Sequence, residues 1–303
     1  MKQITVQQPI LPREQRAFVA SCDKSFEEQM DGVAEAIAAL PSLKLIGLTG
    51  PTCAGKTTAA KKLTACLEAH GHRVHVVSID DFYFDKSVLQ LRAQNDPNIE
   101  IDYDSEETID ISLLAEKTEI LLRGDETKMP RFDFRSGIRG EGITLTPRPE
   151  DVFLFEGIQI LYPKVDRILS GDAYRSIYIC PSSSIEVAGE FFTPNEIRLM
   201  RRLVRDYRYR ASDPAFTLYL WQSVRENEEM NIFPNAHRCH AVIDSTMPYE
   251  IGMLKPYLEE ILPTVPADSP FYGQARAMLA RLSSVVEIPS EYMTENSLYK
   301  EFI

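Results

Sequence analysis

Short apolar runs alternate with amphipathic stretches along most of the chain. Five apolar runs have the length of a strand, and the one at 72–80 is rich in β-branched residues; the runs lie at 43–48, 72–80, 151–158, 176–180 and 240–245. The run at 151–158 (DVFLFEGI) is almost continuously apolar, which is typical of a strand buried on both faces of its sheet. The pattern therefore predicts a sheet that is covered on both sides.

The stretches between these runs have apolar residues at helical spacing. Helices are predicted at 22–40, 57–69, 193–209, 213–227 and 271–284. Thr193 and Glu196 form a capping-box pattern, and Gly71 is a typical helix stop. The alternation predicts an α/β fold, a mostly parallel sheet with helices on both faces. Strands 43–48 and 72–80 are joined by one helix, so we expect them to be parallel neighbours.

Residues 128–149 break this rhythm and predict a β-hairpin. Gly137, Gly140 and Gly142 are expected at or near its turn, and the sequence ITLTP alternates with a period of two. A hairpin inserted before a core strand is expected to lie as a flap over the carboxyl edge of the sheet, where ligands bind in such folds. The expected division is an N-terminal helical extension (1–41), a core domain (42–262) and a C-terminal helical extension packed on the core (263–303).

Composition narrows the class of protein. The 303 residues are 44% hydrophobic, as in ordinary folded domains, and none of the apolar runs approaches the length that spans a bilayer. The formal net charge of −12 argues against a general nucleic-acid binder. The first residues lack the order of a signal peptide, so a cytoplasmic protein without membrane contact is expected. Whether copies associate into a homo-oligomer stays open.

Residues 45–58 (LIGLTGPTCAGKTT) carry the most specific motif. Gly50-x-x-x-x-Gly55-Lys56-Thr57 is the phosphate-binding loop pattern, between a predicted strand and a predicted helix. Glycines let the backbone turn its N–H groups toward phosphate oxygens, and the helix adds its positive end. Lys56 would reach the β and γ phosphates, and Thr57 would hold Mg²⁺. The alternative is a chance match in a turn. The residues expected to bind the nucleotide are Gly50, Pro51, Thr52, Cys53, Ala54, Gly55, Lys56, Thr57 and Thr58.

Two acids end predicted strands next to this loop. Asp80 is expected to face the loop and to take a proton from an attacking hydroxyl, although paired acids after a strand also cap helices or turns. Glu156 ends the third strand, where a carboxylate typically anchors Mg²⁺ through water. Thr57 and Glu156 are therefore the predicted metal residues.

Residues 198–210 (RLMRRLVRDYRYR) contain six arginines and one acid. Such a helix is often solvated or salt-bridged, and some bind nucleic acid. Near a triphosphate, a positive stripe would instead stabilise charge on the transferred phosphoryl group and close as a lid. We favour the lid, at 193–212.

The motifs GPTCAGKTT, SIDDFY, IDYDSEETID, MPRFDF, FLFEGI and RRLVRDYRYR follow one another in the order of a known family. Together they resemble the uridine kinase branch of the phosphoribulokinase/uridine kinase family of P-loop kinases. The resemblance implies transfer of the γ-phosphate of ATP or GTP, with Mg²⁺, to the 5′-hydroxyl of a pyrimidine nucleoside (uridine, cytidine or thymidine).

The resemblance also implies roles for single residues. Asp80 would orient the 5′-hydroxyl, Tyr83 would line the nucleoside pocket, and Asp104 would hold the ribose hydroxyls. Phe132 and Phe134 would flank the base. The phosphates or the sugar would be contacted by Arg202, Arg205 and Arg210. Two differences concern the base: Gly137 stands where uridine and cytidine kinases usually carry a histidine, and Phe132 stands where they have a tyrosine.

Three functions are therefore compared. The first is a nucleoside kinase. The second is a kinase of another small-molecule alcohol, of the sugar phosphate or pantothenate type. The third is a nucleotide-binding regulatory protein, which loss of Lys56, Asp80 or Glu156 would have favoured; all three residues are present.

Overall fold

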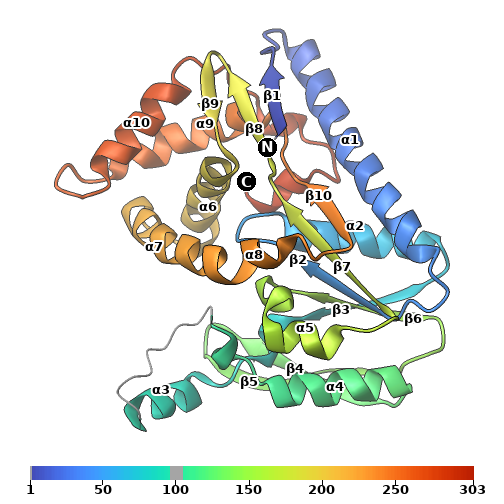
Figure 1. Cartoon of the computed structure of the whole chain (residues 1–303). Helices are drawn as coiled ribbons and strands as arrows, with labels where there is room; N and C mark the ends of the chain where they lie inside the picture. The colour runs from blue at the N-terminus through green and yellow to red at the C-terminus, as the bar shows by residue number, and fades with distance from the viewer. Residues whose placement is uncertain (1, 96–104) are drawn as a thin grey trace.

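The computed structural model describes residues 2–95 and 105–303, and its centre is a parallel sheet of five strands (Figure 1). The order across the sheet is β10 (Ala241–Asp244), β7 (Tyr174–Cys180), β2 (Leu45–Thr49), β6 (Asp151–Glu156) and β3 (Arg73–Ser78). All five predicted strands are confirmed, and so is the α/β class with a mostly parallel sheet.

The predicted neighbourhood of the first two core strands is wrong. β2 and β3 are parallel, but β6 lies between them and pairs with both: Leu45 is opposite Phe153, and Arg73 is opposite Asp151. The helix that joins β2 to β3 therefore crosses over a strand that comes about 70 residues later in the chain.

The two faces of the sheet belong to two hydrophobic clusters, because side chains alternate along each strand. Ile46 and Leu154 face a cluster that includes α1 and α2, whereas Leu45 and Phe153 face a cluster that includes α4 and α5. Burial on both faces explains the nearly continuous apolar run of β6. In Figure 1, α4 and α5 lie on the other side of the sheet from α1.

The helices agree with the sequence pattern in most places. The capping box of Thr193 and Glu196 is formed at the start of α6, and Gly71 follows α2 with a φ of +89°. The first helix, however, begins at Pro12, ten residues before its predicted start. The α-helices are α1 (Pro12–Ala38), α2 (Lys56–Ala69), α3 (Lys86–Asn95), α4 (Ile111–Arg123), α5 (Pro163–Leu169), α6 (Pro194–Arg210), α7 (Pro214–Asn227), α8 (Phe233–Ala236), α9 (Glu250–Ile261) and α10 (Tyr272–Leu282).

The N-terminal extension is not only helical. Strand β1 (Lys2–Val6) pairs in parallel with β8 (Ser183–Val187), and β9 (Glu190–Phe192) completes this second sheet. Side chains of α1, α10 and the last residues share one hydrophobic cluster with the central sheet. Both extensions therefore pack on the core; the domain boundaries themselves stay a prediction.

The hairpin consists of β4 (Thr127–Asp133) and β5 (Ile138–Leu145) and packs on the turn η1 (Ile79–Phe82) that follows β3. Only Gly137 is at its turn, with a φ of +71°, whereas Gly140 and Gly142 lie inside β5. Asp81 fixes the hairpin, since its Oδ1 accepts a hydrogen bond of 3.0 Å from the backbone N–H of Phe132. The hairpin thus lies at the carboxyl edge of the sheet, as predicted.

Within the described ranges, none of the helices is both long enough and apolar enough to cross a membrane.

Candidate functional site

The phosphate-loop motif lies between β2 and α2, as its sequence context predicts. Gly55 is the N-cap of α2 and has a φ of +94°, which favours glycine. A Cβ on Gly50 would lie 2.0 Å from the carbonyl oxygen of Ile179, so a side chain there would displace β7. Lys56 donates from Nζ to the carbonyl oxygens of Gly50 (2.9 Å) and Pro51 (3.0 Å), which holds its ammonium group over the loop.

Two buried ion pairs brace this loop. Arg198 and Glu228 are joined at 2.6 Å, and both also bond to Thr52: Arg198 to its carbonyl oxygen at 3.1 Å and Glu228 to its N–H at 3.0 Å. Arg201 pairs with Glu250 at 2.8 Å and donates to the carbonyl oxygen of Cys53 at 3.2 Å. The arginines that begin the predicted lid are therefore 0% exposed parts of the core. For these two, the salt-bridged interpretation is the correct one.

Cys53 lies in the loop with a φ of 57° and is buried. Burial raises the pKa of its thiol, so it stays protonated at neutral pH. Cys53 therefore serves as a small packed residue of the loop.

Asp80 follows β3 and faces the same cavity as Lys56. Its Oδ1 accepts a hydrogen bond of 3.0 Å from Nε2 of Gln159, and that amide nitrogen also lies 2.7 Å from the hydroxyl of Tyr83. Burial raises the pKa of Asp80, while the Gln159 bond and the charge of Lys56 oppose the rise. The carboxylate is held in one orientation and is more basic than an exposed aspartate.

Glu156 ends β6 and lines the cavity beside Asp80. Ser78 donates from Oγ to its Oε1 at 3.1 Å across the β3–β6 pair. Burial raises the pKa of Glu156, Lys56 lowers it, and the charge of Asp80 raises it again. A buried carboxylate whose pKa is raised by burial and by a second carboxylate favours a cation beside it.

The oxygen atoms at this point suit Mg²⁺. Thr57 and Glu156 both line the cavity, and hydroxyl and carboxylate oxygens are the ligands that Mg²⁺ prefers. Among residues 2–95 and 105–303, however, no three His, Cys, Asp or Glu side chains converge on a metal site. A Mg²⁺ held here would therefore take its remaining ligands from phosphate oxygens and water, as is usual for this ion.

The cavity has a volume of about 520 Å³, and three aromatic rings of its wall pack edge to face. The ring centroids of Tyr83 and Phe132 are 5.6 Å apart, and those of Phe132 and Phe134 are 5.2 Å apart. Phe132 is 7% exposed, whereas Phe134 is 60% exposed. Phe134 thus presents a free ring, whereas Tyr83 and Phe132 form the floor.

Lys86 packs against Gly137, where the hairpin has no side chain. A Cβ on Gly137 would lie 2.3 Å from Cδ of Lys86, so the lysine stem occupies that space. Lys86 also lines the cavity, and its ammonium group has no hydrogen bond or ion pair with any residue that the structure describes. The side of the cavity next to the hairpin therefore carries a cation.

The remaining predicted arginines gather on Asp206, which is buried. Arg202 donates to its Oδ2 at 3.1 Å, Arg205 donates to its Oδ1 at 2.7 Å, and Arg210 is 3.6 Å from its Oδ1. Arg205 and Arg210 line the cavity of about 520 Å³, and Arg202 lines an adjoining one of about 160 Å³. The second half of α6 therefore brings positive charge to the site; a lid movement stays a prediction.

Most of the predicted site residues meet in one place. Thr52, Cys53, Lys56 and Thr57 line the cavity together with Asp80, Tyr83, Phe132, Phe134, Glu156, Arg205 and Arg210. Gly50 and Ala54 are buried in the loop behind them, and Pro51 and Thr58 belong to its two ends. Asp104 lies outside the described residues.

Sequence reasoning missed the residues that support this set. The position of Gln159 could have identified it as a site residue, because it follows Glu156 at the carboxyl end of a core strand, where site residues gather. No local sequence feature marks the acids Glu228, Glu250 and Glu301 as site residues, since they lie in helical segments far along the chain.

The sequence pattern of the Phosphoribulokinase / Uridine kinase family matches residues 45–251. The uridine kinase of Staphylococcus aureus (strain JH9) is similar, with 31% identity over 178 residues that make up 58% of this chain and 75% of that protein. A possible uridine kinase from Bacillus stearothermophilus is 18% identical, with 72% of this chain and 98% of that chain covered and a TM-score of 0.47. A putative fructose transport system kinase from Silicibacter sp. TM1040 is 19% identical, with 70% and 98% covered and a TM-score of 0.47.

Proposed function

The chain belongs to the phosphoribulokinase/uridine kinase family and is therefore an ATP-dependent kinase of small molecules, and we propose that its acceptor is a pyrimidine nucleoside. The proposed reaction moves the γ-phosphate of ATP (or GTP) to the 5′-hydroxyl and yields the nucleoside monophosphate. The similarity to curated uridine kinases supports a nucleoside acceptor.

One observation carries the proposal. Lys56, Asp80 and three aromatic side chains line a single cavity of about 520 Å³, which is large enough for a nucleoside. A base, a hydroxyl and a terminal phosphate bound together would then meet the ring wall, the carboxylate and the ammonium group respectively.

The proposed mechanism needs no covalent intermediate. Asp80, fixed by Gln159, accepts a hydrogen bond from the 5′-hydroxyl, orients it toward the γ-phosphorus and takes its proton as the new O–P bond forms. Lys56, Arg205 and Arg210 stabilise the charge that spreads over the phosphoryl oxygens. The leaving group is the nucleoside diphosphate.

Mg²⁺ fits beside Thr57 and Glu156, as argued above, and would neutralise charge on the β and γ phosphates. On the acceptor side, Phe134 offers the exposed face on which a base can stack, and Tyr83 and Phe132 support it. Asp104 keeps the ribose-binding role that the family resemblance gives it.

Lys86 favours a second acceptor. Its ammonium group has no partner among the described residues and lines the cavity, which suits an alcohol that carries a carboxylate or a phosphate, such as a sugar phosphate or a pantothenate-like hydroxy acid. This candidate uses the same donor site and the same general base, Asp80.

A coupled assay of nucleoside diphosphate release (ADP from ATP, GDP from GTP) decides between the two. The panel contains uridine, cytidine, deoxyuridine, deoxycytidine, thymidine, several sugar phosphates and pantothenate, each with ATP and with GTP. Release with a pyrimidine nucleoside at a kcat/KM at least tenfold above every anionic alcohol is the expected result. The reverse order would replace the nucleoside by the second candidate.

A further inference from the structure

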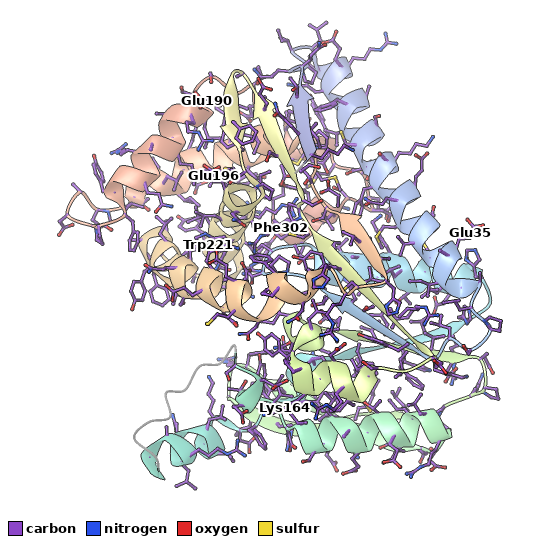
Figure 2. All side chains as sticks on the ribbon, viewed as in Figure 1. Glu35, Lys164, Glu190, Glu196, Trp221 and Phe302 are labelled. Atoms are coloured by element: carbon purple, nitrogen blue, oxygen red, sulfur yellow. The ribbon has the colours of Figure 1, made fainter. Side chains whose placement is uncertain are left out.

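The last residues of the chain lie against the phosphate loop. Leu298, in the short helix η7 (Leu298–Glu301), packs so closely that a Cβ on Gly55 would lie 2.5 Å from its Cδ1. Figure 2 shows Phe302 inside the molecule near α6, and the guanidinium carbon of Arg201 lies 5.1 Å from the centre of its ring. This segment, residues 297–303, follows the part of the chain that matches the family.

The segment is firmly anchored. Tyr299 is buried and donates a hydrogen bond to Glu250, and Arg201 donates from Nε to the Tyr299 hydroxyl at 3.3 Å. Ser297 caps η7 by accepting from the Tyr299 N–H at 3.3 Å. The position of Glu301, two residues after Tyr299, is therefore set by the core of the protein.

Glu301 uses a phosphate-binding group of the loop. Its Oε2 accepts a hydrogen bond of 3.1 Å from the backbone N–H of Thr58, in the first turn of α2. First-turn N–H groups of this helix have no partner within the helix, and they are the donors that bind phosphate oxygens in such loops. A carboxylate of this chain thus takes one of the hydrogen bonds that the phosphates of a nucleotide need.

Glu301 also faces the centre of the site. It lines the 520 Å³ cavity with Lys56 and Asp80, and its negative charge contributes to the raised pKa of Glu156. A polyphosphate that entered the loop would meet this third carboxylate at close range, and the two negative charges would repel each other.

A second cavity offers an alternative position for the Glu301 carboxylate. This cavity, of about 650 Å³ between α1, α2 and residues 295–301, has Glu301, Lys61 and Lys300 in its wall. Its wall also holds the Lys62–Glu27 ion pair and the acids Asp31 and Glu295. The ammonium groups of Lys61 and Lys300 have no hydrogen bond or ion pair in the described part of the chain. A rotation of the Glu301 side chain would move its charge from the loop toward these cations.

We propose that Glu301 competes with the donor nucleotide for the phosphate loop, so that nucleotide binding displaces this carboxylate into the neighbouring cavity. The competition lowers the affinity for the donor. This inference rests on the proposed donor site, but not on the identity of the acceptor.

The test compares the full chain with Glu301→Gln and with Glu291→Gln. Glutamine keeps the shape of residue 301 and an oxygen for the Thr58 N–H, and it removes only the charge. Glu291 is an exposed acid of the same C-terminal region that lines neither the 520 Å³ cavity nor the 650 Å³ cavity, and it serves as the control. Dissociation constants for ATP and for tripolyphosphate are measured by isothermal titration calorimetry in the presence of EDTA.

Glu301→Gln is expected to bind both ligands roughly tenfold more tightly, because one like charge next to the helix terminus is removed. Glu291→Gln is expected to bind them as the wild type does. Unchanged or weaker binding by Glu301→Gln would overturn the inference. Tighter binding of ATP without tighter binding of tripolyphosphate would overturn it too, since that gain would come from contacts with the adenine ring.

The outcome is separable from the proposed function. Tighter ATP binding by Glu301→Gln in a chain that phosphorylates no nucleoside would support the inference and refute the nucleoside acceptor. Nucleoside phosphorylation, together with equal ATP affinity of the wild type and Glu301→Gln, would support the nucleoside acceptor and refute the inference.

Discussion

Gln159 donates a hydrogen bond of 3.0 Å from its Nε2 to Oδ1 of Asp80. Its amide nitrogen also lies 2.7 Å from the Tyr83 hydroxyl, so the proposed base is joined to the wall of the acceptor cavity. Burial raises the pKa of Asp80, and this hydrogen bond limits the rise because it favours the charged carboxylate.

Gln159→Leu should therefore change the pH dependence of turnover. Asp80 must be deprotonated to accept a proton, and loss of the hydrogen bond raises its pKa further, so the acid limb of the kcat profile moves to higher pH. At neutral pH, kcat should fall roughly tenfold because the carboxylate is also less well oriented. Steady-state rates between pH 5 and 9 measure both effects. A lower kcat with the acid limb at its wild-type pH would mean that Gln159 only shapes the cavity.

Glu228→Ala should destabilise the fold, because it leaves Arg198 buried without its carboxylate partner and leaves the Thr52 N–H unbonded. The expected loss in the free energy of unfolding is about 3–5 kcal/mol, measured by urea denaturation. Glu229→Ala is the matched control, since Glu229 pairs with Arg225 on the surface and should change stability by about 0.5 kcal/mol or less. Equal effects of the two substitutions would show that the ion pair does not brace the loop.

Phe134→Ala should raise KM for the nucleoside roughly tenfold and leave KM for ATP nearly unchanged, because it removes the exposed ring on which the base stacks. Phe216→Ala provides the comparison: Phe216 on α7 is 54% exposed, close to the 60% of Phe134, and does not line the cavity. Substrate-saturation curves for both ligands suffice. A parallel rise of the two KM values in Phe134→Ala would place the acceptor elsewhere.

Lys86→Met should separate the two acceptor classes. A hydrogen bond from Lys86 to a neutral carbonyl of a base is worth less than one to a carboxylate or phosphate, so KM should rise roughly threefold for a nucleoside and roughly thirtyfold for an anionic alcohol. Lys86→Arg should restore the KM of an anionic acceptor. A KM that stays constant for every active acceptor would remove Lys86 from the acceptor site.

Local signals explain which parts of this molecule could be predicted. The loop motif specifies its own strand, turn and helix, and Asp80 and Glu156 end strands that are recognisable as apolar runs. Because parallel strands end at one edge, these residues were expected to meet even though β2 and β3 are not the direct neighbours that were predicted. The order depends on β6, which enters between β2 and β3 from far along the chain.

Long-range pairing explains what could not be predicted. Arg198 and Arg201 belong to the same arginine-rich helix as Arg205 and Arg210, and nothing local distinguishes the two pairs. Glu228 and Glu250 lie 30 and 49 residues further along, and only the fold brings them against Arg198 and Arg201. Lys86 likewise becomes visible as a site residue only once Gly137 packs against its stem.

Phosphate transfer from ATP to a pyrimidine nucleoside by Asp80→Asn tests the central claim most directly. With the wild type as reference, and with ATP binding followed by calorimetry on the same samples, kcat should fall on the order of a hundredfold or more while the dissociation constant for ATP changes less than about twofold. Transfer by Asp80→Asn at the wild-type rate would contradict the claim that this carboxylate positions the alcohol in front of the nucleotide held by Lys56.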